Sequence, residues 1–339
     1  MWWGSSPLVI GLGEGENFLG SDVAAFVAYT KRAMEIDQDQ AVMVSADKVV
    51  VSDFMGNIVP DPKIYTVDWD ASAAEKGGWD SFMDKEIHED PAAVQRTLLG
   101  RLDKDGNLNL DEVRIDEHDF KAIDKIIVIA CGTAAYAGMV AKYAIEHWVR
   151  IPVEVELAHE FRYRDPILTP RTLVVAISQS GETMDTLMAL RHAREQGSKV
   201  LAICNTQGAS IPRESDAVLY THAGPEVAVA STKAFVAQIT AAYVLGLYLA
   251  QIKGAMFRDE IQQTLDSLKD MPRKIQWVLD TQTKAVHDAA AQMVDAKSFL
   301  FLGRHVGYPV AMEGALKLKE IAYTFTEGFA AGELKHGPI

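Results

Sequence analysis

Residues 172–197, TLVVAISQSGETMDTLMALRHAREQG, determine the expected fold. The first seven are mostly apolar, as in a strand buried on both faces, and apolar residues recur at helical spacing from Met184 onward. The strand therefore ends and the helix begins within 178–183, a turn of small, hydroxyl-bearing residues. A helix N-terminus presents unpaired N–H groups and the positive end of the helix dipole, so this turn predicts a phosphate cradle, although without the lysine of a Walker loop. The alternative is an ordinary Ser/Thr N-cap, with Glu182 complementing the dipole.

The same strand-then-helix pattern extends from residue 125 to residue 253. Apolar strands alternate there with helices, which predicts an α/β fold with a doubly wound parallel sheet. Two further turns, at 131–133 (CGT) and 229–232 (VAST), also open helices. Ligands of such sheets bind beyond the carboxyl ends of the strands. The three turns together predict a pocket for a phosphorylated, hydroxyl-rich ligand.

Composition and charge limit the classes of partner. The chain has 339 residues, 48% of them hydrophobic and 24% charged, with a formal net charge of −14. This balance disfavours nucleic acid and anionic membranes as main partners. Two cysteines, Cys131 and Cys204, are too few for a disulfide framework and favour a reducing cytoplasm. We expect no membrane span and no signal peptide, since the opening MWWGSSPLVIG lacks a basic region.

The two ends of the chain lack the regular alternation of strands and helices found in its middle. Residues 1–60 resemble short strands joined by turns, residues 61–80 resemble a polar linker, and a helix is expected from Pro91 onward. Two helices with polar faces are expected within 259–295, followed by a strand at SFLFLGR and a helix at PVAMEGALKLKEIAY.

An internal repeat is also expected. Arg304 would correspond to Cys131 (304 − 131 = 173) and Glu333 to Glu160 (333 − 160 = 173). The counterpart of Ser178 would then fall beyond residue 339, so a second sheet would be incomplete and would leave an open edge. We therefore expect a fragment, or a chain that needs a partner to finish its fold.

Five motifs in this order carry a family resemblance: ACGTA, ISQSGETMDT, VASTKAF, EGALKLKE and AGELKHGP. They resemble the sugar-isomerase (SIS) half of the isomerizing glutamine–fructose-6-phosphate aminotransferases, and SPLVIGLGEGENFLGSD resembles the end of the glutaminase domain of that family. The resemblance covers nearly the whole chain, from about residue 6, and the motifs are highly specific as a set.

The resemblance also implies a division into domains. The expected parts are a β-rich remnant of an N-terminal-nucleophile glutaminase domain, a linker and helix, a first SIS domain, connecting helices and a partial second SIS domain. Their expected bounds are 1–60, 61–117, 118–258, 259–294 and 295–339.

For the function, the resemblance implies that fructose 6-phosphate and glutamine give glucosamine 6-phosphate and glutamate. Glutamine would be a substrate only of a full-length protein. No cofactor and no metal is implied, and the expected location is the cytoplasm. The expected partners are the sugar phosphates and a second copy of the chain in a homodimer, with neither nucleic acid nor membrane.

The resemblance assigns three groups of residues to the site. Four should hold the phosphate: Ser178, Gln179, Ser180 and Thr183. Three should line the sugar: Thr133, Val229 and Ser231. Three belong to the isomerase machinery: Lys317, Glu320, which moves a proton between C1 and C2, and His336, which assists ring opening from a neighbouring subunit.

Elementary chemistry agrees with the role of Glu320, because an aldose–ketose conversion needs a base that shuttles a proton between adjacent carbons. On a helix, Glu313, Lys317 and Glu320 fall on one narrow stripe. Glu–Lys pairs at this spacing are also common on helix surfaces, which is the alternative. His336 on its own would be an ordinary surface histidine.

Three departures from the family pattern limit the expected activity. The chain begins Met1-Trp2-Trp3 rather than with the nucleophilic cysteine of the glutaminase, so glutamine hydrolysis is not expected. The family's Schiff-base lysine near the C-terminus has no counterpart before residue 339, and this role is not reassigned to Lys317. Ala134 stands where the family has a serine.

Two other functions remain open. A non-catalytic sugar-phosphate sensor would use an SIS domain only for binding, but it would not need Glu320 or His336. A stand-alone phosphosugar isomerase or deaminase would have no use for the glutaminase-like residues 6–60. Turnover of fructose 6-phosphate with ammonia would separate an enzyme from a sensor.

Overall fold

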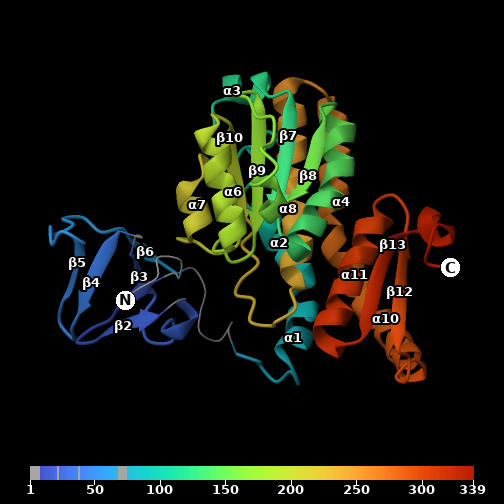
Figure 1. The fold of residues 1–339 in the computed structure, drawn as a ribbon, viewed down its shortest axis with the longest axis horizontal. Coiled ribbons are helices and arrows are strands. Elements are labelled where there is room, and N and C mark those ends of the chain that lie inside the picture. The colour runs from blue at the N-terminus through green and yellow to red at the C-terminus, as the bar shows by residue number, and fades with distance from the viewer. Residues whose placement is uncertain (1–7, 21–22, 37–38, 68–74, 111) are drawn as a thin grey trace.

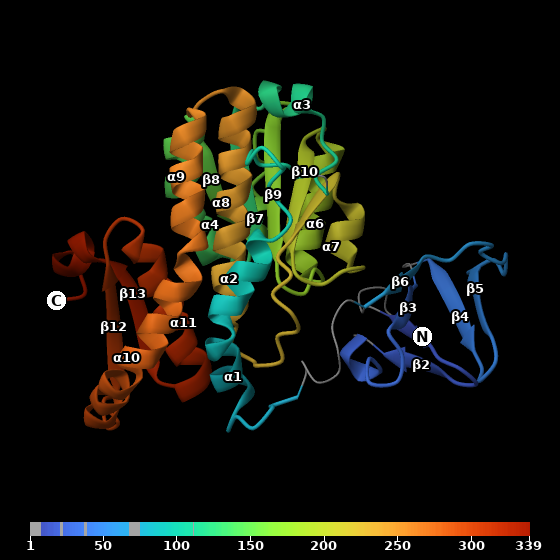
Figure 2. The same ribbon diagram turned by 180° about the vertical axis from the view of Figure 1, so that it is seen from behind.

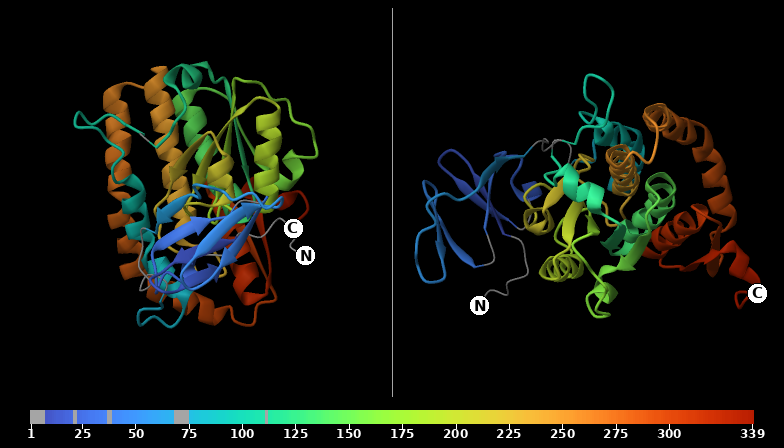
Figure 3. Two further views of the ribbon diagram at one scale, coloured as in Figure 1. Left: turned by 90° about the vertical axis from the view of Figure 1, so that its left-hand side faces the viewer. Right: turned by 90° about the horizontal axis from the view of Figure 1, so that it is seen from above.

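The structure is a computed structural model that describes residues 8–20, 23–36, 39–67, 75–110 and 112–339. A β-rich N-terminal unit, a central parallel sheet with helices on both faces and a C-terminal strand–helix–strand unit follow one another along the chain (Figure 1). The two terminal units lie on opposite sides of the central sheet, as Figure 3 shows from two further directions.

The central sheet has five parallel strands in the order β11-β10-β9-β7-β8. Their bounds are β7 Lys125–Ala130, β8 Val153–Leu157, β9 Thr172–Ser178, β10 Lys199–Cys204 and β11 Ala217–Tyr220. All seven residues of β9 are buried because the sheet is covered on both faces. Successive β9 residues alternate between two hydrophobic clusters: Val175 packs on one face, and Val174 and Ala176 pack on the other.

Helices cover both faces of this sheet. On one face lie α4 (Gly132–Val149) and α8 (Lys233–Lys253), of which α8 is seen in front of the sheet in Figure 2. The other face carries α5 (Ala158–Phe161), α6 (Met184–Glu195) and α7 (Ser210–Glu214). The shorter helices α3 (Glu117–Ala122) and α9 (Arg258–Lys269) pack on the same side of the sheet as α4 and α8. The predicted doubly wound α/β architecture is confirmed.

The strand order places the direction change between β7 and β9, which are neighbours although β8 lies between them in sequence. From β7 the chain winds outward to β8 on one side, and to β9, β10 and β11 on the other. The turns that follow β7 and β9 therefore lie side by side at the carboxyl edge of the sheet. This is the position at which sheets of this kind bind ligands.

The N-terminal unit contains an antiparallel sheet in the order β2-β1-β3-β6 and a β4–β5 hairpin. The bounds are β1 Val9–Leu12, β2 Asn17–Gly20, η1 Val23–Ala25, β3 Arg32–Glu35, β4 Gln40–Val44, β5 Val49–Asp53 and β6 Ile64–Thr66. The predicted β-rich region is confirmed. The expected polar linker at 61–80 is wrong at its start, because Ile64 pairs with Met34 as part of an edge strand. That strand is too short to show an alternating pattern.

Two helices connect the N-terminal unit to the central sheet. Helix α2 (Asp90–Leu98) has Pro91 in its first turn and corresponds to the helix expected from that residue. Helix α1 (Phe82–His88) precedes it and was not expected. Together, α1 and α2 run alongside the loop that joins β11 to α8 (Figure 1).

The C-terminal part begins with α10 (Met271–Gln292) and continues with β12 (Ser298–Gly303), α11 (Gly307–Ala322), β13 (Phe325–Ala330) and η3 (Ala331–Lys335). Strands β12 and β13 pair in parallel, as β7 and β8 do. β12 starts 173 residues after β7 (298 − 125 = 173). Among the described residues β12 has no second neighbouring strand, and Leu300, Leu302 and Phe325 are exposed.

Helix α8 corrects one expectation from the sequence. It is the one described helix that is long and apolar enough to cross a membrane by length and composition, whereas no such run was expected. Most of its length is buried inside the fold, against α4, α2 and the parallel sheet. A helix that is hydrophobic all round is typical of a protein core as well as of a membrane span.

Candidate functional site at the carboxyl edge of the sheet

The turn after β9 is held by hydrogen bonds of its own hydroxyl groups. Ser178 is 2% exposed, and its Oγ accepts a hydrogen bond from the Gly181 amide (3.0 Å) and pairs with Thr183 Oγ1 (3.1 Å). The Oγ of Ser180 accepts from the Glu182 amide (3.2 Å). Gly181 has a positive φ of 71°. These bonds draw the chain into a tight turn in front of α6.

The N-terminus of α6 has no side-chain cap. Thr183 is the N-cap residue, but its hydroxyl pairs with Ser178 instead of accepting from the helix. The Glu182 carboxylate accepts from the Ser210 amide (2.8 Å) at the start of α7. The simple-cap alternative is therefore wrong for this turn. The first amides of α6 have no intrahelical acceptor and face the carboxyl edge, where an anion would be favoured.

Gln179 lies at the junction between β9 and β10. Its carbonyl oxygen accepts from the amides of Asn205 (3.2 Å) and Thr206 (3.3 Å) and from the Thr206 hydroxyl (3.3 Å). The backbone of the turn is thereby held to the end of the neighbouring strand. Four residues expected to hold phosphate are thus brought together in one turn: Ser178, Gln179, Ser180 and Thr183.

The second part of the site joins the central sheet to α11. Lys317 Nζ donates to Thr133 Oγ1 (3.0 Å), and Thr133 Oγ1 donates to Glu313 Oε1 (3.0 Å). Lys317 also forms ion pairs with Glu313 (3.3 Å) and Glu320 (2.8 Å). The predicted shared helix face of Glu313, Lys317 and Glu320 is confirmed, and it packs against the first turn of α4.

Glu313 has an unusual environment for a carboxylate. The residue is 5% exposed, and its Oε2 has no hydrogen-bond partner among the described residues. Burial raises the pKa of Glu313 above its ordinary range, and Lys317 and Thr133 oppose this rise. Lys317 therefore lies between two carboxylates, of which Glu320 is the less buried. A carboxylate with this exposure and a cationic neighbour can accept and return a proton.

The loop from β11 to α8 carries the other expected sugar-binding residues. Val229 is 96% exposed. Ser231 donates its hydroxyl hydrogen to Glu226 Oε2 (2.9 Å), and Glu226 Oε1 accepts from the amides of Thr232 (2.9 Å) and Ala234 (3.1 Å). Glu226 therefore caps α8 from within the loop.

His336 is not brought to this cluster. It follows η3 after β13, is exposed, and forms no hydrogen bond or ion pair with Lys317 or Glu320. Figure 1 shows the C-terminal end on the far side of the β12–β13 unit from the central sheet. The ten expected site residues thus fall into a phosphate turn (178–183), a Thr133–Lys317–Glu320 cluster and the loop with Val229 and Ser231, and His336 contacts none of these through an ion pair or a side-chain hydrogen bond.

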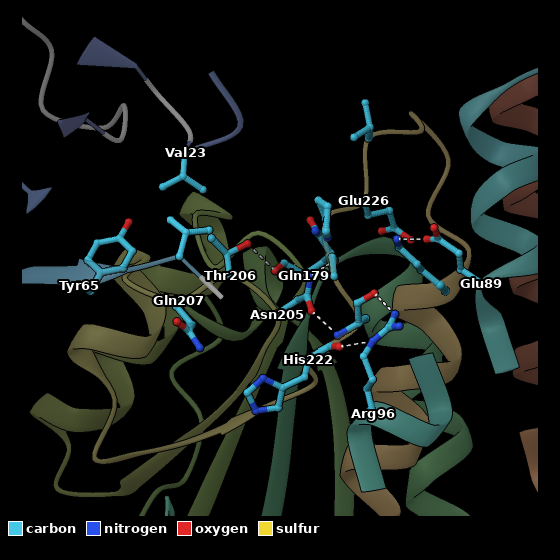
Figure 4. A pocket seen from close by; sticks show the side chains of 16 residues that line it. Val23, Tyr65, Glu89, Arg96, Gln179, Asn205, Thr206, Gln207, His222 and Glu226 are labelled. Carbon is cyan, nitrogen blue, oxygen red and sulfur yellow. Dashed lines mark hydrogen bonds and ion pairs between the residues drawn. The ribbon is translucent and has the colours of Figure 1, made fainter. Parts of the chain in front are cut away.

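A cavity of about 450 Å³ lies beside this edge, between the N-terminal unit and the ends of β9, β10 and β11 (Figure 4). Its size suits a small metabolite. Gln179, Glu226 and Lys233 line it, as do Val23 and Tyr65 of the N-terminal unit. Within it, Arg96 donates to the carbonyl oxygens of His222 and Ala223, and Lys233 pairs with Glu89.

The cysteines and the acidic residues could in principle support two other chemistries, nucleophilic attack and metal binding. Burial raises the pKa of the Cys204 thiol to about 12, so this residue is not a nucleophile. Cys131 precedes α4 and lies 3.9 Å from Thr186 Oγ1. In the part of the chain that the structure describes, no three His, Cys, Asp or Glu residues are grouped as metal ligands.

Sequence reasoning missed two carboxylates, Glu226 and Glu86, which hold the β11–α8 loop. Glu86 Oε1 accepts from the amides of Val227 (2.7 Å) and Ala228 (3.1 Å). The Gly-Pro-Glu stretch before VAST could have drawn attention to Glu226. Nothing near Glu86 in sequence signals its role, because its partners lie 141 and 142 positions away.

The chain and its fold are similar to known proteins. Residues 120–248 match the SIS domain family. The chain is 69% identical over 335 residues to a glutamine–fructose-6-phosphate aminotransferase [isomerizing] of Corynebacterium efficiens, covering 99% of this chain and 54% of that protein. The C-terminal domain of glucosamine-fructose-6-phosphate aminotransferase from Francisella tularensis superposes with a TM-score of 0.75 at 42% identity, covering 78% of this chain and 73% of that one.

The chain belongs to the glutamine–fructose-6-phosphate aminotransferase family. It spans about half the length of the curated relatives it matches. A putative phosphosugar isomerase of Clostridium difficile shares the fold at 22% identity, with a TM-score of 0.68. The family resemblance found in the sequence motifs is therefore confirmed.

Proposed function

We propose that this chain supplies the sugar-phosphate half of an isomerizing glutamine–fructose-6-phosphate aminotransferase. It binds fructose 6-phosphate at the carboxyl edge of the central sheet and prepares the sugar for amination to glucosamine 6-phosphate. The observation that carries this proposal is the contact of Lys317 with Thr133 and Glu320. This contact supports the proposal because it links Glu320, the candidate proton-transfer carboxylate, through Lys317 to the turn after β7.

The proposed roles follow the geometry. The turn 178–183 and the first amides of α6 hold the phosphate. The residues that face the sugar are Thr133, Val229 and Ser231. Glu320 transfers the proton between C1 and C2, and Lys317 fixes its position. Ala134, which is buried in α4, contributes no hydroxyl, so backbone amides take its share of any anion contact.

We further propose that the active form is a homodimer in which His336 comes from the second copy. The exposed position of His336 after η3, without an ion pair or hydrogen bond to Lys317 or Glu320, supports this arrangement. In the complete protein, ammonia comes from glutamine at a separate site, and the enzyme acts in the cytoplasm without a metal or cofactor. A non-catalytic binding module is the second candidate, because the turn 178–183 is formed within a single chain, whereas His336 would have to come from a second copy.

The test follows hydrogen exchange at C1 of fructose 6-phosphate in D₂O by proton NMR. We expect the chain to catalyse the exchange and Glu320→Gln to slow it by about 100-fold or more while the sugar phosphate still binds. Glu327→Gln, which removes an exposed carboxylate on β13, should leave the rate unchanged. Binding without exchange in the unmodified chain would contradict the enzyme and favour the binding module.

A further inference from the structure

The loop of residues 221–232, here called the sugar loop, is held mainly by residues outside itself. At its start, Arg96 donates to the carbonyl oxygens of His222 (2.9 Å) and Ala223 (2.8 Å), and Thr97 donates to that of Thr221 (2.6 Å). Both donors belong to α2. This end of the loop is thus fixed by a helix that lies outside the 120–248 segment matched by the SIS family.

The middle of the sugar loop depends on one side chain. The amides of Val227 and Ala228 both donate to Glu86 Oε1, at 2.7 and 3.1 Å. Val227 is itself exposed, and Val229 is almost fully exposed. Glu86 thus holds the two amides that lie between the end of the loop fixed by α2 and the end at which Glu226 caps α8.

Glu86 is built into the fold in a way that an ordinary surface acid is not. It lies on α1, is 2% exposed, and its Oε2 has no hydrogen-bond partner among the described residues. Burial raises the pKa of Glu86, while the two amides of the loop lower it. Burying a carboxylate is costly unless it is hydrogen-bonded. The two hydrogen bonds from the loop amides therefore offset part of the cost of burying Glu86.

We propose that Glu86 is a positioning residue for the sugar: it fixes residues 227–228 and thereby sets where Val229 and Ser231 meet the substrate. The inference rests on the proposed function, which assigns the sugar to this loop and the phosphate to the turn 178–183. Glu86 forms hydrogen bonds with the sugar loop and none with the turn 178–183. Removing its carboxylate should therefore weaken the binding of the sugar more than the binding of the phosphate.

The test compares the affinities for fructose 6-phosphate and for inorganic phosphate by calorimetric titration. We expect Glu86→Ala to lower the affinity for fructose 6-phosphate about tenfold or more, because two hydrogen bonds to loop amides are lost. The affinity for inorganic phosphate should change less than about twofold. Glu86→Gln keeps a carbonyl oxygen that can accept both amide hydrogens, so it should restore most of the affinity. Equal losses for both ligands, or no loss, would overturn the proposal.

Glu146→Ala is the matched control. Glu146 Oε1 also accepts a backbone hydrogen bond, from the Val153 amide (2.9 Å), but at the opposite edge of the sheet. We expect this variant to lower the melting temperature without changing the ratio of the two affinities. A changed ratio in this control would show that general destabilisation alone produces the effect, which would count against a specific role of Glu86.

Two further readouts keep the outcome decisive. If Glu86→Ala does not fold, Glu86→Asp shortens the side chain by one methylene, and its selective loss of sugar-phosphate affinity takes the place of the Ala result. Amide hydrogen exchange at Val227 and Ala228 should rise in Glu86→Ala and not in Glu86→Gln. If the unmodified chain binds fructose 6-phosphate no more tightly than inorganic phosphate, the proposed function fails. If amide hydrogen exchange at Val227 and Ala228 is the same in Glu86→Ala as in the unmodified chain, the positioning role of Glu86 is overturned.

Discussion

Lys317 on α11 donates a hydrogen bond of 3.0 Å to the hydroxyl of Thr133 at the start of α4, across 184 positions of sequence. Thr133 has one hydroxyl hydrogen, which it donates to Glu313. The Thr133 hydroxyl therefore accepts a hydrogen bond from the ammonium group of Lys317 and donates one to the buried carboxylate of Glu313. These two hydrogen bonds link the C-terminal unit to the site edge of the central sheet.

The first prediction concerns these two hydrogen bonds of Thr133. Thr133→Val keeps the shape of the side chain but removes both hydrogen bonds, which leaves Glu313 with the Lys317 ion pair alone. We expect the free energy of unfolding to fall by about 2 kcal/mol, measured by urea denaturation. Thr133→Ser retains the hydroxyl and should cost less than about 1 kcal/mol. Similar losses in the two variants would show that the hydroxyl group is not what stabilises this contact.

The second prediction concerns the turn after β9. Gly181 has a φ of 71°, and a Cβ there would lie 2.5 Å from Ala209 Cβ and 2.8 Å from Cys204 Sγ. We expect Gly181→Ala to lower the free energy of unfolding by about 3 kcal/mol, since strain and overpacking add.

Gly197 is its control. It has a φ of 86° with nothing within 4 Å of a built Cβ, so Gly197→Ala should cost only the backbone strain, about 1 kcal/mol. If thermal and urea unfolding gave equal losses for the two variants, close packing around Gly181 would not be the reason for the glycine.

The third prediction is a pH dependence of stability at the base of the sugar loop. Burial, followed by the Glu226 carboxylate, raises the pKa of Asp90 from 3.8 to about 7. The folded state therefore binds this proton more tightly than the unfolded chain. The resulting stabilisation is present below about pH 4 and is lost as the pH rises to about 7.

Asp90→Asn isolates that effect. We expect the unmodified chain to lose on the order of 2 kcal/mol more stability between pH 4 and pH 8 than Asp90→Asn does, measured by urea denaturation at each pH. Glu86 and Glu313 also have raised pKa values, but they contribute equally to both proteins. Parallel pH profiles of the two proteins would contradict the raised pKa of Asp90.

The sequence predicted the central sheet well because its strands are buried on both faces and read as continuous apolar runs, as in β9. It missed β6 and α1, because they have only three and seven residues, too few to show a clear strand or helix periodicity, and they are stabilised by tertiary contacts. Among the described helices, α8 alone has the length and composition of a membrane span, and it can be apolar all round because α4, α2 and the sheet bury most of it.

The site was predictable where its residues share a turn or a helix face. The phosphate turn is contiguous in sequence, and Glu313, Lys317 and Glu320 follow helical spacing. Glu86 was not predictable, because its acceptor role depends on α1 packing against the sugar loop more than a hundred residues away. Loop anchors of this kind have no local pattern, since any buried acceptor at that point in space would serve.

The most direct test of the central claim is a pair of calorimetric titrations, with fructose 6-phosphate and with fructose, on the unmodified chain and on Ser180→Ala. We predict that Ser180→Ala weakens fructose 6-phosphate by roughly 10- to 100-fold and leaves fructose almost unchanged, because Ser180 lies in the turn assigned to the phosphate. Ser215→Ala, at the other edge of the sheet, should change neither affinity. Equal losses for both ligands in Ser180→Ala would contradict a phosphate site at this turn.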